Sequence, residues 1–239
     1  MRRTLWIVVL SLLLIVTFTS IVYIGYLSIQ QDYLPAMEQF AINNWFKQQN
    51  TAVETKSISQ TITYTNRLII ENIAGNISIV GENTNEITII ADVEVTSNDQ
   101  ERAMALLEQI DLLVQDQSSS SIMTIIPPLV DKETATVNLS LVVPQEIQGT
   151  INTRQGNIKI TNLTGNLEVN TGQGHVELQI PEDTGYNITA SYPSGSFHTE
   201  LPLSGTQTDN FVEGVIGVTH QDNQLIINVE SGSINIKYY

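Results

Sequence analysis

The stretch RQGNIKITNLTGNLEVNTGQGHVEL, residues 154–178, contains four glycines and almost no bulky aromatic residue. Such a stretch is either a glycine-rich loop that binds phosphate or a set of turns between short strands. Aligned on glycine, it resolves into three segments that begin at Gly156, Gly165 and Gly174. Each reads glycine, polar, apolar, polar, apolar. Nine residues hold one strand and one turn, so two segments complete one coil of a two-sided stack.

The same five-residue pattern recurs elsewhere as GNISI at Gly75, GSFHT at Gly195 and GSINI at Gly232. A glycine before each strand supplies a positive φ angle or a close approach of two backbones. A repeat that buries its apolar side against its neighbours is a solenoid-like unit. We therefore interpret these six residues as structural turn glycines.

Two further segments alternate between apolar and polar residues, and a third has helical spacing. EITIIADVEV (86–95) and TVNLSLVV (136–143) place their apolar residues on one side, as strands with one buried face do. NDQERAMALLEQI (98–110) has a capping residue in Asn98 or Asp99 and apolar residues at helical spacing, so Met104 and the leucines are expected in the core. The predicted fold is all-β: solenoid-like stacked β-strand repeats with one short helix, preceded by an N-terminal transmembrane helix.

The glycines do not fit the known nucleotide or calcium motifs. A dinucleotide fingerprint needs a third glycine where Glu177 stands, followed by a helix, and a phosphate loop needs Gly-Lys-Ser/Thr. The nonapeptide calcium roll needs acidic residues in its turns, whereas these turns carry Asn and Gln. We predict no cofactor and no metal site.

From about residue 66 to its end, the chain resembles the bacterial putative-adhesin family of β-strand-repeat domains, also called toast-rack domains. The resemblance is carried by LIIENIAGNISIVG, ERAMALLEQI, NLSLVVPQEI, the Gly-x-apolar units and, most closely, GVIGVTHQDNQLIINVESGSINIKYY. Two turns carry Gln-Gly where family members usually have Ser-Gly or Asn-Gly. The resemblance implies an extracytoplasmic repeat domain, often next to a membrane anchor and linked to envelope adhesion or envelope stress. It supplies no catalytic residues.

The N-terminus carries an uncharged apolar run, LWIVVLSLLLIVTFTSIVYIGYL, from Leu5 to Leu27. As a helix it would be about 35 Å long, enough to cross a hydrocarbon core of about 30 Å. Arg2 and Arg3 precede the run, so the positive-inside rule predicts a single-pass protein of the cytoplasmic membrane with its N-terminus inside. The alternative is a cleaved signal peptide, because small residues occur at Thr17, Thr19 and Ser20. In both cases the C-terminal domain is extracytoplasmic.

These patterns divide the chain into three parts. Residues 1–30 form a cytoplasmic tip and transmembrane anchor, residues 31–57 a juxtamembrane helix and polar linker, and residues 58–239 an extracytoplasmic β-repeat domain. The predicted juxtamembrane helix begins near Asp32 and Pro35.

Charge and composition limit the partners. The net charge is −15 and the chain has no cysteine, which removes disulfides and thiolate sites. An acidic surface repels nucleic acid and disfavours anionic lipid or wall polymer. The predicted partners are the lipid bilayer, through the N-terminal span, and an unidentified envelope polymer or membrane protein, but no nucleic acid.

The residues that carry reactive groups are scattered along the chain. His175 and Glu177 share the polar side of one strand, and coils stacked in register would place Lys159 beside Glu177. The expected result is a solvated cross-strand ion pair. Together with Glu168, these residues are the predicted surface-contact residues. Glycoside hydrolysis needs two clustered carboxyl groups, which the scattered acids do not provide, so no catalytic residue is assigned.

The leading hypothesis is a membrane-anchored, adhesin-like, non-enzymatic interaction or scaffold module at the cell envelope. A sensory or regulatory subunit of an envelope-stress system is the alternative, and a carbohydrate-active enzyme is the third. Exchange of the 5–27 span for an unrelated one separates the first two, because only a signalling helix depends on its own sequence.

Overall fold

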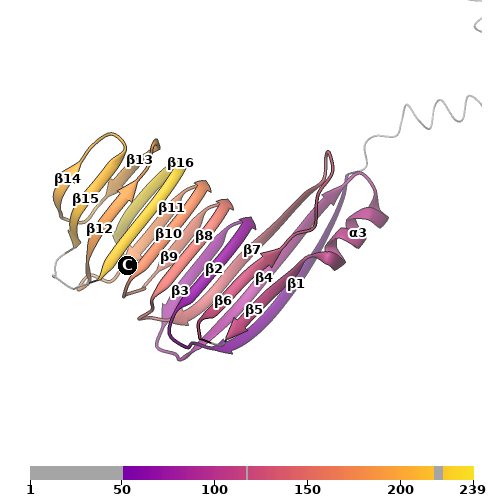
Figure 1. Cartoon of the computed structure of the whole chain (residues 1–239), viewed down its shortest axis with the longest axis horizontal. Helices are drawn as coiled ribbons and strands as arrows, with labels where there is room; N and C mark the ends of the chain where they lie inside the picture. The colour runs from indigo at the N-terminus through magenta and orange to yellow at the C-terminus, as the bar shows by residue number, and fades with distance from the viewer. Residues whose placement is uncertain (1–50, 117, 218–222) are drawn as a thin grey trace, which may run out of the picture. The chain divides into compact units, whose positions relative to one another are not determined.

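The computed structural model describes residues 51–116, 118–217 and 223–239. The predicted anchor at 1–30 and the predicted juxtamembrane helix lie outside the described residues. Within the described ranges, no helix is long and apolar enough to span a membrane. Residues 51–239 form one compact unit. This unit is all-β, with a single helix among its described residues (Figure 1).

One continuous sheet contains all sixteen strands of the described residues. The first eight are β1 (Ala52–Thr63), β2 (Leu68–Ala74), β3 (Ile77–Glu82), β4 (Glu86–Ser97), β5 (Asp111–Asp116), β6 (Ser120–Ile125), β7 (Thr134–Pro144) and β8 (Gly149–Gln155). The others are β9 (Ile158–Thr161), β10 (Leu167–Gln173), β11 (Val176–Ile180), β12 (Gly185–Ser191), β13 (Ser194–Thr199), β14 (Leu203–Gln207), β15 (Phe211–Gly217) and β16 (Gln224–Tyr238). The helix α3 (Gln100–Gln109) follows β4.

The sheet folds back on itself into two layers that share β16. We call the layer nearer the viewer in Figure 1 the front sheet; its strand order is β5-β6-β2-β8-β10-β16-β12-β15-β14. The back sheet has the order β1-β4-β7-β3-β9-β11-β16-β13. The outermost strands β1 and β5 contact each other, so the sheet is nearly closed.

The core lies between the two layers and is built by the alternation seen in the sequence. Every second residue of β4 from Ile87 to Val95 is almost fully buried, and so is every second residue of β7 from Val137 to Val143. A side chain of this kind contributes about 1.5–3 kcal/mol when it is buried. Tyr186 is also buried, and its hydroxyl donates to the Leu163 carbonyl oxygen at 2.9 Å. Burial raises the pKa of Tyr186.

The repeating unit is a coil made of a front strand, a corner glycine and a back strand. The coils β8–β9 and β10–β11 lie side by side, with Gly149 paired to Leu167 and Ile158 paired to Val176. The pairing is parallel, and equivalent positions in the two coils are 18 residues apart. The eighteen-residue coil predicted from the glycine spacing is therefore present.

The coils do not stack in chain order, which the nine-residue pattern does not indicate. The last coil, β16, lies between β10–β11 on one side and β12–β13 on the other. Residues 224–231 belong to the front sheet and residues 231–238 to the back sheet. The inward apolar residues of both halves are at most 1% exposed: Leu225, Ile227, Val229, Ile234 and Ile236. An insertion of this kind gives β16 a hydrogen-bonded neighbour on each edge of both halves.

The predicted polar linker to residue 57 is wrong over residues 52–57. These residues begin β1, which pairs antiparallel with β4 along its full length, from Ala52 with Ser97 to Thr63 with Glu86. The linker prediction failed because residues 52–57 show no apolar alternation; the inward positions include Glu54 and Lys56. The backbone ladder to β4 runs through these residues, and Ala52, Ile58 and Ile62 of β1 also pack against the core.

Helix α3 forms where the spacing predicted it. The Asp99 side chain caps it by accepting from the Glu101 N–H at 3.1 Å. Ala103 and Leu106 are buried, whereas Met104 is 44% exposed, so the expectation that Met104 packs in the core is wrong. Met104 lies on the outer side of a short helix that contacts β1 and β4 with its opposite side.

Candidate functional site

The corner glycines form a column along the stack. Gly75, Gly156, Gly174 and Gly232 have φ angles of +121°, +145°, +151° and +146°. A Cβ atom on any of them would lie closer than 3.0 Å to a backbone carbonyl oxygen: that of Val137 for Gly75, and that of the preceding glycine in the column for the others. Only glycine combines this φ angle with so close a backbone. The column sets how tightly the coils can stack.

Two of the predicted turn glycines have a different environment. Gly165, with a φ angle of +93°, lies outside this column, where its α-carbon faces the Ile147 carbonyl oxygen. Gly195 stands at the end of the column against the Gly232 carbonyl oxygen, but its φ angle is not positive. The nine-residue alignment thus mixes glycines from different places in the coil.

A ladder of side chains follows the glycine column on the back sheet. The Asn76 N–H donates to Asn138 Oδ1 at 2.9 Å, and the Asn157 N–H donates to Asn76 Oδ1 at 3.0 Å. The His175 N–H donates to Asn157 Oδ1 at 2.9 Å, and His175 Nδ1 lies 2.7 Å from Ser233 Oγ. Each polar side chain after a corner glycine thus binds the next coil. The polar position of the repeat therefore has a structural role.

A second ladder crosses the outward side of the front sheet. Asn170 Nδ2 donates to Asn152 Oδ1 at 2.9 Å, and Asn228 Nδ2 donates to Asn170 Oδ1 at 2.8 Å. Asn170 Nδ2 also donates to Glu168 Oε1 at 3.2 Å. The predicted contact residue Glu168 therefore belongs to this amide row.

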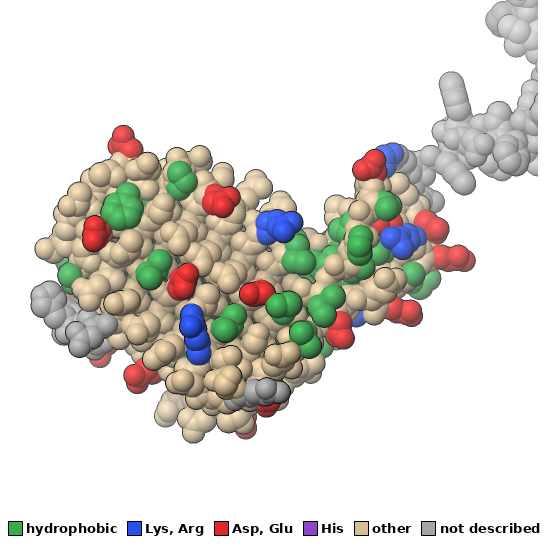
Figure 2. Space-filling model, viewed as in Figure 1, with side chains coloured by type: hydrophobic (Ala, Val, Ile, Leu, Met, Phe, Trp, Pro, Cys, Tyr) green, Lys and Arg blue, Asp and Glu red, His purple; other side chains and the backbone are tan. Residues whose placement is uncertain are grey.

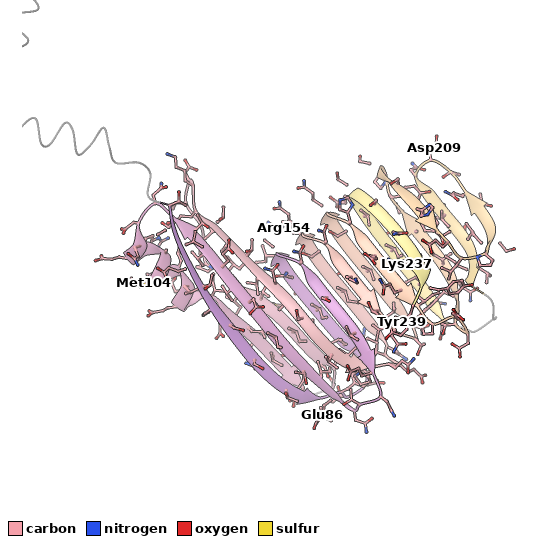
Figure 3. The ribbon with its side chains drawn as sticks, turned by 180° about the vertical axis from the view of Figure 1, so that it is seen from behind. Glu86, Met104, Arg154, Asp209, Lys237 and Tyr239 are labelled. Atoms are coloured by element: carbon pink, nitrogen blue, oxygen red, sulfur yellow. The ribbon has the colours of Figure 1, made fainter. Side chains whose placement is uncertain are left out.

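Lys159 and Glu177 are register partners on the back sheet, and a second lysine joins them. Glu177 Oε1 lies 3.8 Å from Lys159 Nζ and 3.0 Å from Lys237 Nζ. Gln179 Nε2 donates to the same oxygen at 2.7 Å. The hydrogen bonds from Lys237 and then from Gln179 hold the pKa of Glu177 below its ordinary value of 4.5. The cluster joins three coils through β9, β11 and β16, and Figure 3 labels Lys237 on the last of these.

The four predicted contact residues do not form one site. Lys159, His175 and Glu177 lie on the outward side of the back sheet, whereas Glu168 lies on the outward side of the front sheet. Two strands of one coil belong to opposite layers, so residues nine apart in the sequence are separated by the core.

Sequence reasoning missed Lys237 and both side-chain ladders. The recurring Gly-Asn pairs at 75–76 and 156–157 were a usable signal for the back ladder. No such signal exists for Lys237, because the glycine spacing does not predict that β16 pairs with β11.

Three open hollows lie on the outward side and lower edge of the front sheet. The largest, of about 410 Å³, is lined by Glu71, Asn72, Ile73, Met123, Thr124, Asn152, Thr153 and Arg154. Two smaller ones, of about 360 and 220 Å³, share Gln148 and Asn166 and so adjoin each other. The hollows are open depressions in a broad surface.

Few reactive side chains among the described residues lie close enough together to act as one chemical site. Over 51–116, 118–217 and 223–239, no group of three or more His, Asp and Glu residues could hold a metal ion. The charged and amide side chains described above bind one another across coils. This arrangement presents an extended polar surface.

Comparison with known proteins gives one family and one fold. The model of the Toastrack DUF4097 family matches residues 42–237. A putative cell adhesion protein from Clostridium sporogenes ATCC 15579 is 14% identical, with a TM-score of 0.50, over 78% of this chain and 100% of its own. This similarity shows the fold. No curated protein matches the chain.

Two other crystal structures are more distant. A putative adhesin from Bacteroides fragilis NCTC 9343 is 12% identical over 76% of this chain and 97% of its own, with a TM-score of 0.28. A putative adhesin from Parabacteroides merdae ATCC 43184 is 12% identical over 78% of each chain, with a TM-score of 0.30.

Proposed function

We propose that this chain, which belongs to the Toastrack DUF4097 family, is a non-enzymatic interaction or scaffold module that a membrane anchor holds outside the cytoplasmic membrane. The apolar run at 5–27, with Arg2 and Arg3 before it, supports the anchor and its orientation. The description of the C. sporogenes protein as a putative cell adhesion protein is consistent with an interaction role.

One observation carries the proposed interaction role. The two sheets offer broad outward surfaces on which polar side chains recur from coil to coil, as in the amide row Asn152, Asn170 and Asn228. Repeat proteins use extended surfaces of this kind for binding. The candidate reactive groups His175 and Glu177 lie on such a surface and bond to neighbouring side chains.

The proposed location is tested by protease accessibility in intact cells. The full chain carries one tag at its N-terminus and another at its C-terminus, and protease is added from outside. We expect loss of the C-terminal tag and retention of the N-terminal tag. Protection of the C-terminal tag until the membrane is broken would contradict the proposed orientation.

The interaction role is tested by removing part of the polar surface of the front sheet, in variants that are first shown by thermal unfolding to be folded. A triple variant, Asn152→Ala with Asn170→Ala and Asn228→Ala, removes the exposed amide row, whereas Ser78→Ala on the outward side of the back sheet is the control. After crosslinking in cells, adducts of the full chain are identified by mass spectrometry. We expect the triple variant to lose an adduct that the control keeps. Absence of any adduct from the unaltered chain would count against the proposed role.

A further inference from the structure

The front sheet ends in a hairpin whose last strand has one open edge. β14 pairs with β15 and with no other strand of the described residues. At one end of the hairpin, the Gly217 N–H donates to the Pro202 carbonyl oxygen at 3.1 Å. At the other end, the Thr208 N–H donates to the Phe211 carbonyl oxygen at 2.8 Å. Figure 1 shows β14 as the outermost strand at the left end of the β-repeat unit.

The register of the hairpin shows which backbone groups face the open edge. In an antiparallel pair, hydrogen-bonded and non-hydrogen-bonded residues alternate along each strand. The bonds at Pro202 and Thr208 place the even-numbered residues of β14 opposite bonded partners in β15. The backbone N–H and C=O groups of Leu203, Gly205 and Gln207 therefore point away from β15, toward the open edge. No strand among the described residues pairs with that edge.

The opposite end of the sheet is protected against strand addition, whereas β14 is not. The edge strand β1 places Glu54 and Lys56 at inward positions, and helix α3 contacts it. Asp111 and Asp116 stand at the two ends of β5, the other edge strand there. Charged residues and a covering helix are common means of blocking a sheet edge. β14, with the sequence LSGTQ, contains no charged residue and no proline.

The surroundings of this edge are acidic. Residues 182–217, which contain β12 to β15, have five acidic residues and neither lysine nor arginine; the acids are Glu182, Asp183, Glu200, Asp209 and Glu213. The single histidine of this range is His198 of β13. Glu213 is the register partner of Thr206, and Figure 3 labels Asp209 between β14 and β15. In Figure 2, the left end of the unit shows acidic side chains and no lysine or arginine.

From these observations we propose that the open edge of β14 binds an extended, lysine- or arginine-rich segment of a partner protein, which adds to the front sheet as a further strand. Backbone hydrogen bonds with Leu203, Gly205 and Gln207 supply the affinity, and the surrounding acids select a segment of positive charge. The inference rests on the proposed interaction role and deepens it by naming the chemistry of the partner.

Charge separates this partner from a second copy of the chain. Strands in a sheet lie about 4.8 Å apart, so a strand added to β14 lies about 10 Å from Glu213 of β15, comparable to the Debye length at about 0.1 M salt. A lysine or arginine side chain spans much of that distance. Two copies of this edge would instead bring Asp209 and Glu213 of one copy near the same acids of the other, and like charges repel.

Charge also distinguishes β14 from the second open edge at this end. β13 pairs with β16 and with no other strand of the described residues. It adjoins the half of β16 that carries Lys237, so its surroundings contain both signs of charge. The edge of β14 is therefore the better match for a basic segment.

The test uses synthetic peptides that differ from one another in one property. Lys-Val-Lys-Val-Lys-Val-Lys is basic and free to pair as a strand. The same peptide with every backbone nitrogen methylated keeps the charge but donates no backbone hydrogen bond, and Glu-Val-Glu-Val-Glu-Val-Glu keeps the backbone but reverses the charge. Binding of each labelled peptide to the full chain in nonionic detergent is measured by fluorescence anisotropy. We expect the lysine peptide to bind at least about tenfold more tightly than either of the others.

Two variants at one position locate the binding edge. Gln207→Pro removes an outward N–H without removing a hydrogen bond to β15, and proline is tolerated at such positions of an edge strand. Gln207→Ala loses the same side chain but keeps the N–H. Thermal unfolding first shows whether each variant is folded. We expect Gln207→Pro to weaken binding of the lysine peptide by at least about fivefold, and Gln207→Ala to change it by less than about twofold.

Several results would overturn the inference. These are equal affinity for the lysine peptide and its methylated form, binding of the glutamate peptide as tightly as the lysine peptide, or equal binding of the lysine peptide by the two Gln207 variants. If Gln207→Pro does not fold, the comparison among the peptides still decides. The native chain has no cysteine, so a disulfide-linked homodimer of Gln207→Cys in native membranes would assign the edge to a second copy and also overturn the inference. The proposed interaction role is tested separately, by the adducts of the unaltered chain in cells.

Discussion

The coil region and the antiparallel region use different means to hold their strands together. The coil region, made of β2–β3, β8–β13 and β16, stacks parallel strands around a glycine column and side-chain ladders. The antiparallel region joins β1, β4 and β7 in one layer and β5 and β6 in the other. Its strands β1, β4 and β7 are 11 or 12 residues long, and β4 contains no glycine. A tight corner requires glycine at a fixed position, whereas a long antiparallel ladder mainly requires that apolar and polar residues alternate.

The largest expected effect comes from β16, because its coil has neighbours on both sides. Ile227 is fully buried in that strand, whereas Ile226 beside it is 36% exposed. Ile227→Asp buries a carboxylate without a partner and should destabilise the domain by more than about 4 kcal/mol, enough to prevent folding. Ile226→Asp should change stability by less than about 1 kcal/mol. Chemical denaturation of the two variants measures the difference.

If both substitutions have the same small effect, β16 is not a central strand. An equally large effect of Ile226→Asp would instead place that side chain in the core. Either result would remove the inserted coil from the architecture.

The next effect concerns the glycine column. Gly174→Ala adds a methyl group where a carbonyl oxygen already stands and where the φ angle is +151°. The expected cost is about 2–4 kcal/mol, from backbone strain and overpacking together. Gly149→Ala is the matched control, because its nearest neighbours are flexible side-chain atoms at 3.2 and 3.3 Å and its φ angle is not positive. Thermal and denaturant unfolding measure both.

Similar stabilities of the two alanine variants would mean that the column does not limit how coils stack. A destabilised Gly174→Ala beside a native-like Gly149→Ala would confine the requirement for glycine to the corners. No such dependence exists along β4, so the pair of variants sharpens the contrast between the two regions.

The periodicity of the sequence predicted some structural features of the two regions and not others. The glycine spacing predicted the eighteen-residue coil and the Lys159–Glu177 neighbourhood, because both depend on short distances along the chain. The alternation in 86–95 and 136–143 predicted buried faces for the same reason. The stacking order was not predictable, since the pairing of β16 with β11 joins residues far apart along the chain, such as Val176 and Ile234.

The prediction of a linker over residues 52–57 was wrong for a different reason. From Glu54 to Ser57 their side chains are polar on both sides of the strand. These residues pair with β4 through the backbone, and the Lys56 ammonium donates to the Ile110 carbonyl oxygen. Backbone hydrogen bonds do not depend on side-chain identity. A polar edge strand therefore resembles a linker until its partner strand is known.

One buried amide joins the two regions and gives the third prediction. Asn72 Nδ2 donates to the Val137 carbonyl oxygen at 2.9 Å, and Asn72 Oδ1 accepts from the Thr124 hydroxyl at 2.9 Å. Asn72→Leu leaves these buried groups without a partner and should cost about 1–3 kcal/mol. Thr153→Val is the control at the paired position of β8, where the hydroxyl makes a single 3.4 Å hydrogen bond.

The control should lose less than about 1 kcal/mol, because its one hydrogen bond is long. Equal losses in the two variants would show that Asn72 contributes no more than an ordinary polar residue of the coil. Hydrogen exchange distinguishes the cases further, since Asn72→Leu should speed exchange in β6 and β7 as well as in β2.

The smallest expected effect is on the pH dependence of stability, to which one carboxyl group in each region contributes. Hydrogen bonds from Lys237 and Gln179 lower the pKa of Glu177 in the coil region, and a hydrogen bond from Arg102, followed by one from the Val130 N–H, lowers the pKa of Glu133 in the antiparallel region.

A carboxyl group whose pKa is lower in the folded than in the unfolded state stabilises the fold when the pH is above its ordinary pKa of 4.5. That contribution is lost as the pH falls below this value toward the lower folded pKa. Glu177→Gln and Glu133→Gln should each flatten the decline of the unfolding free energy between pH 5 and pH 3, measured by denaturation at low salt.

For Glu177 the loss at pH 7 should not exceed about 1 kcal/mol, because the pair is exposed to solvent. Glu133 holds α3 against the segment before β7, so its substitution should speed hydrogen exchange in α3 while leaving the coils unchanged. A faster exchange of β9 and β11 in Glu133→Gln would mean that the two regions unfold as one unit. In that case the two regions differ in how their strands are held together but do not differ in local stability.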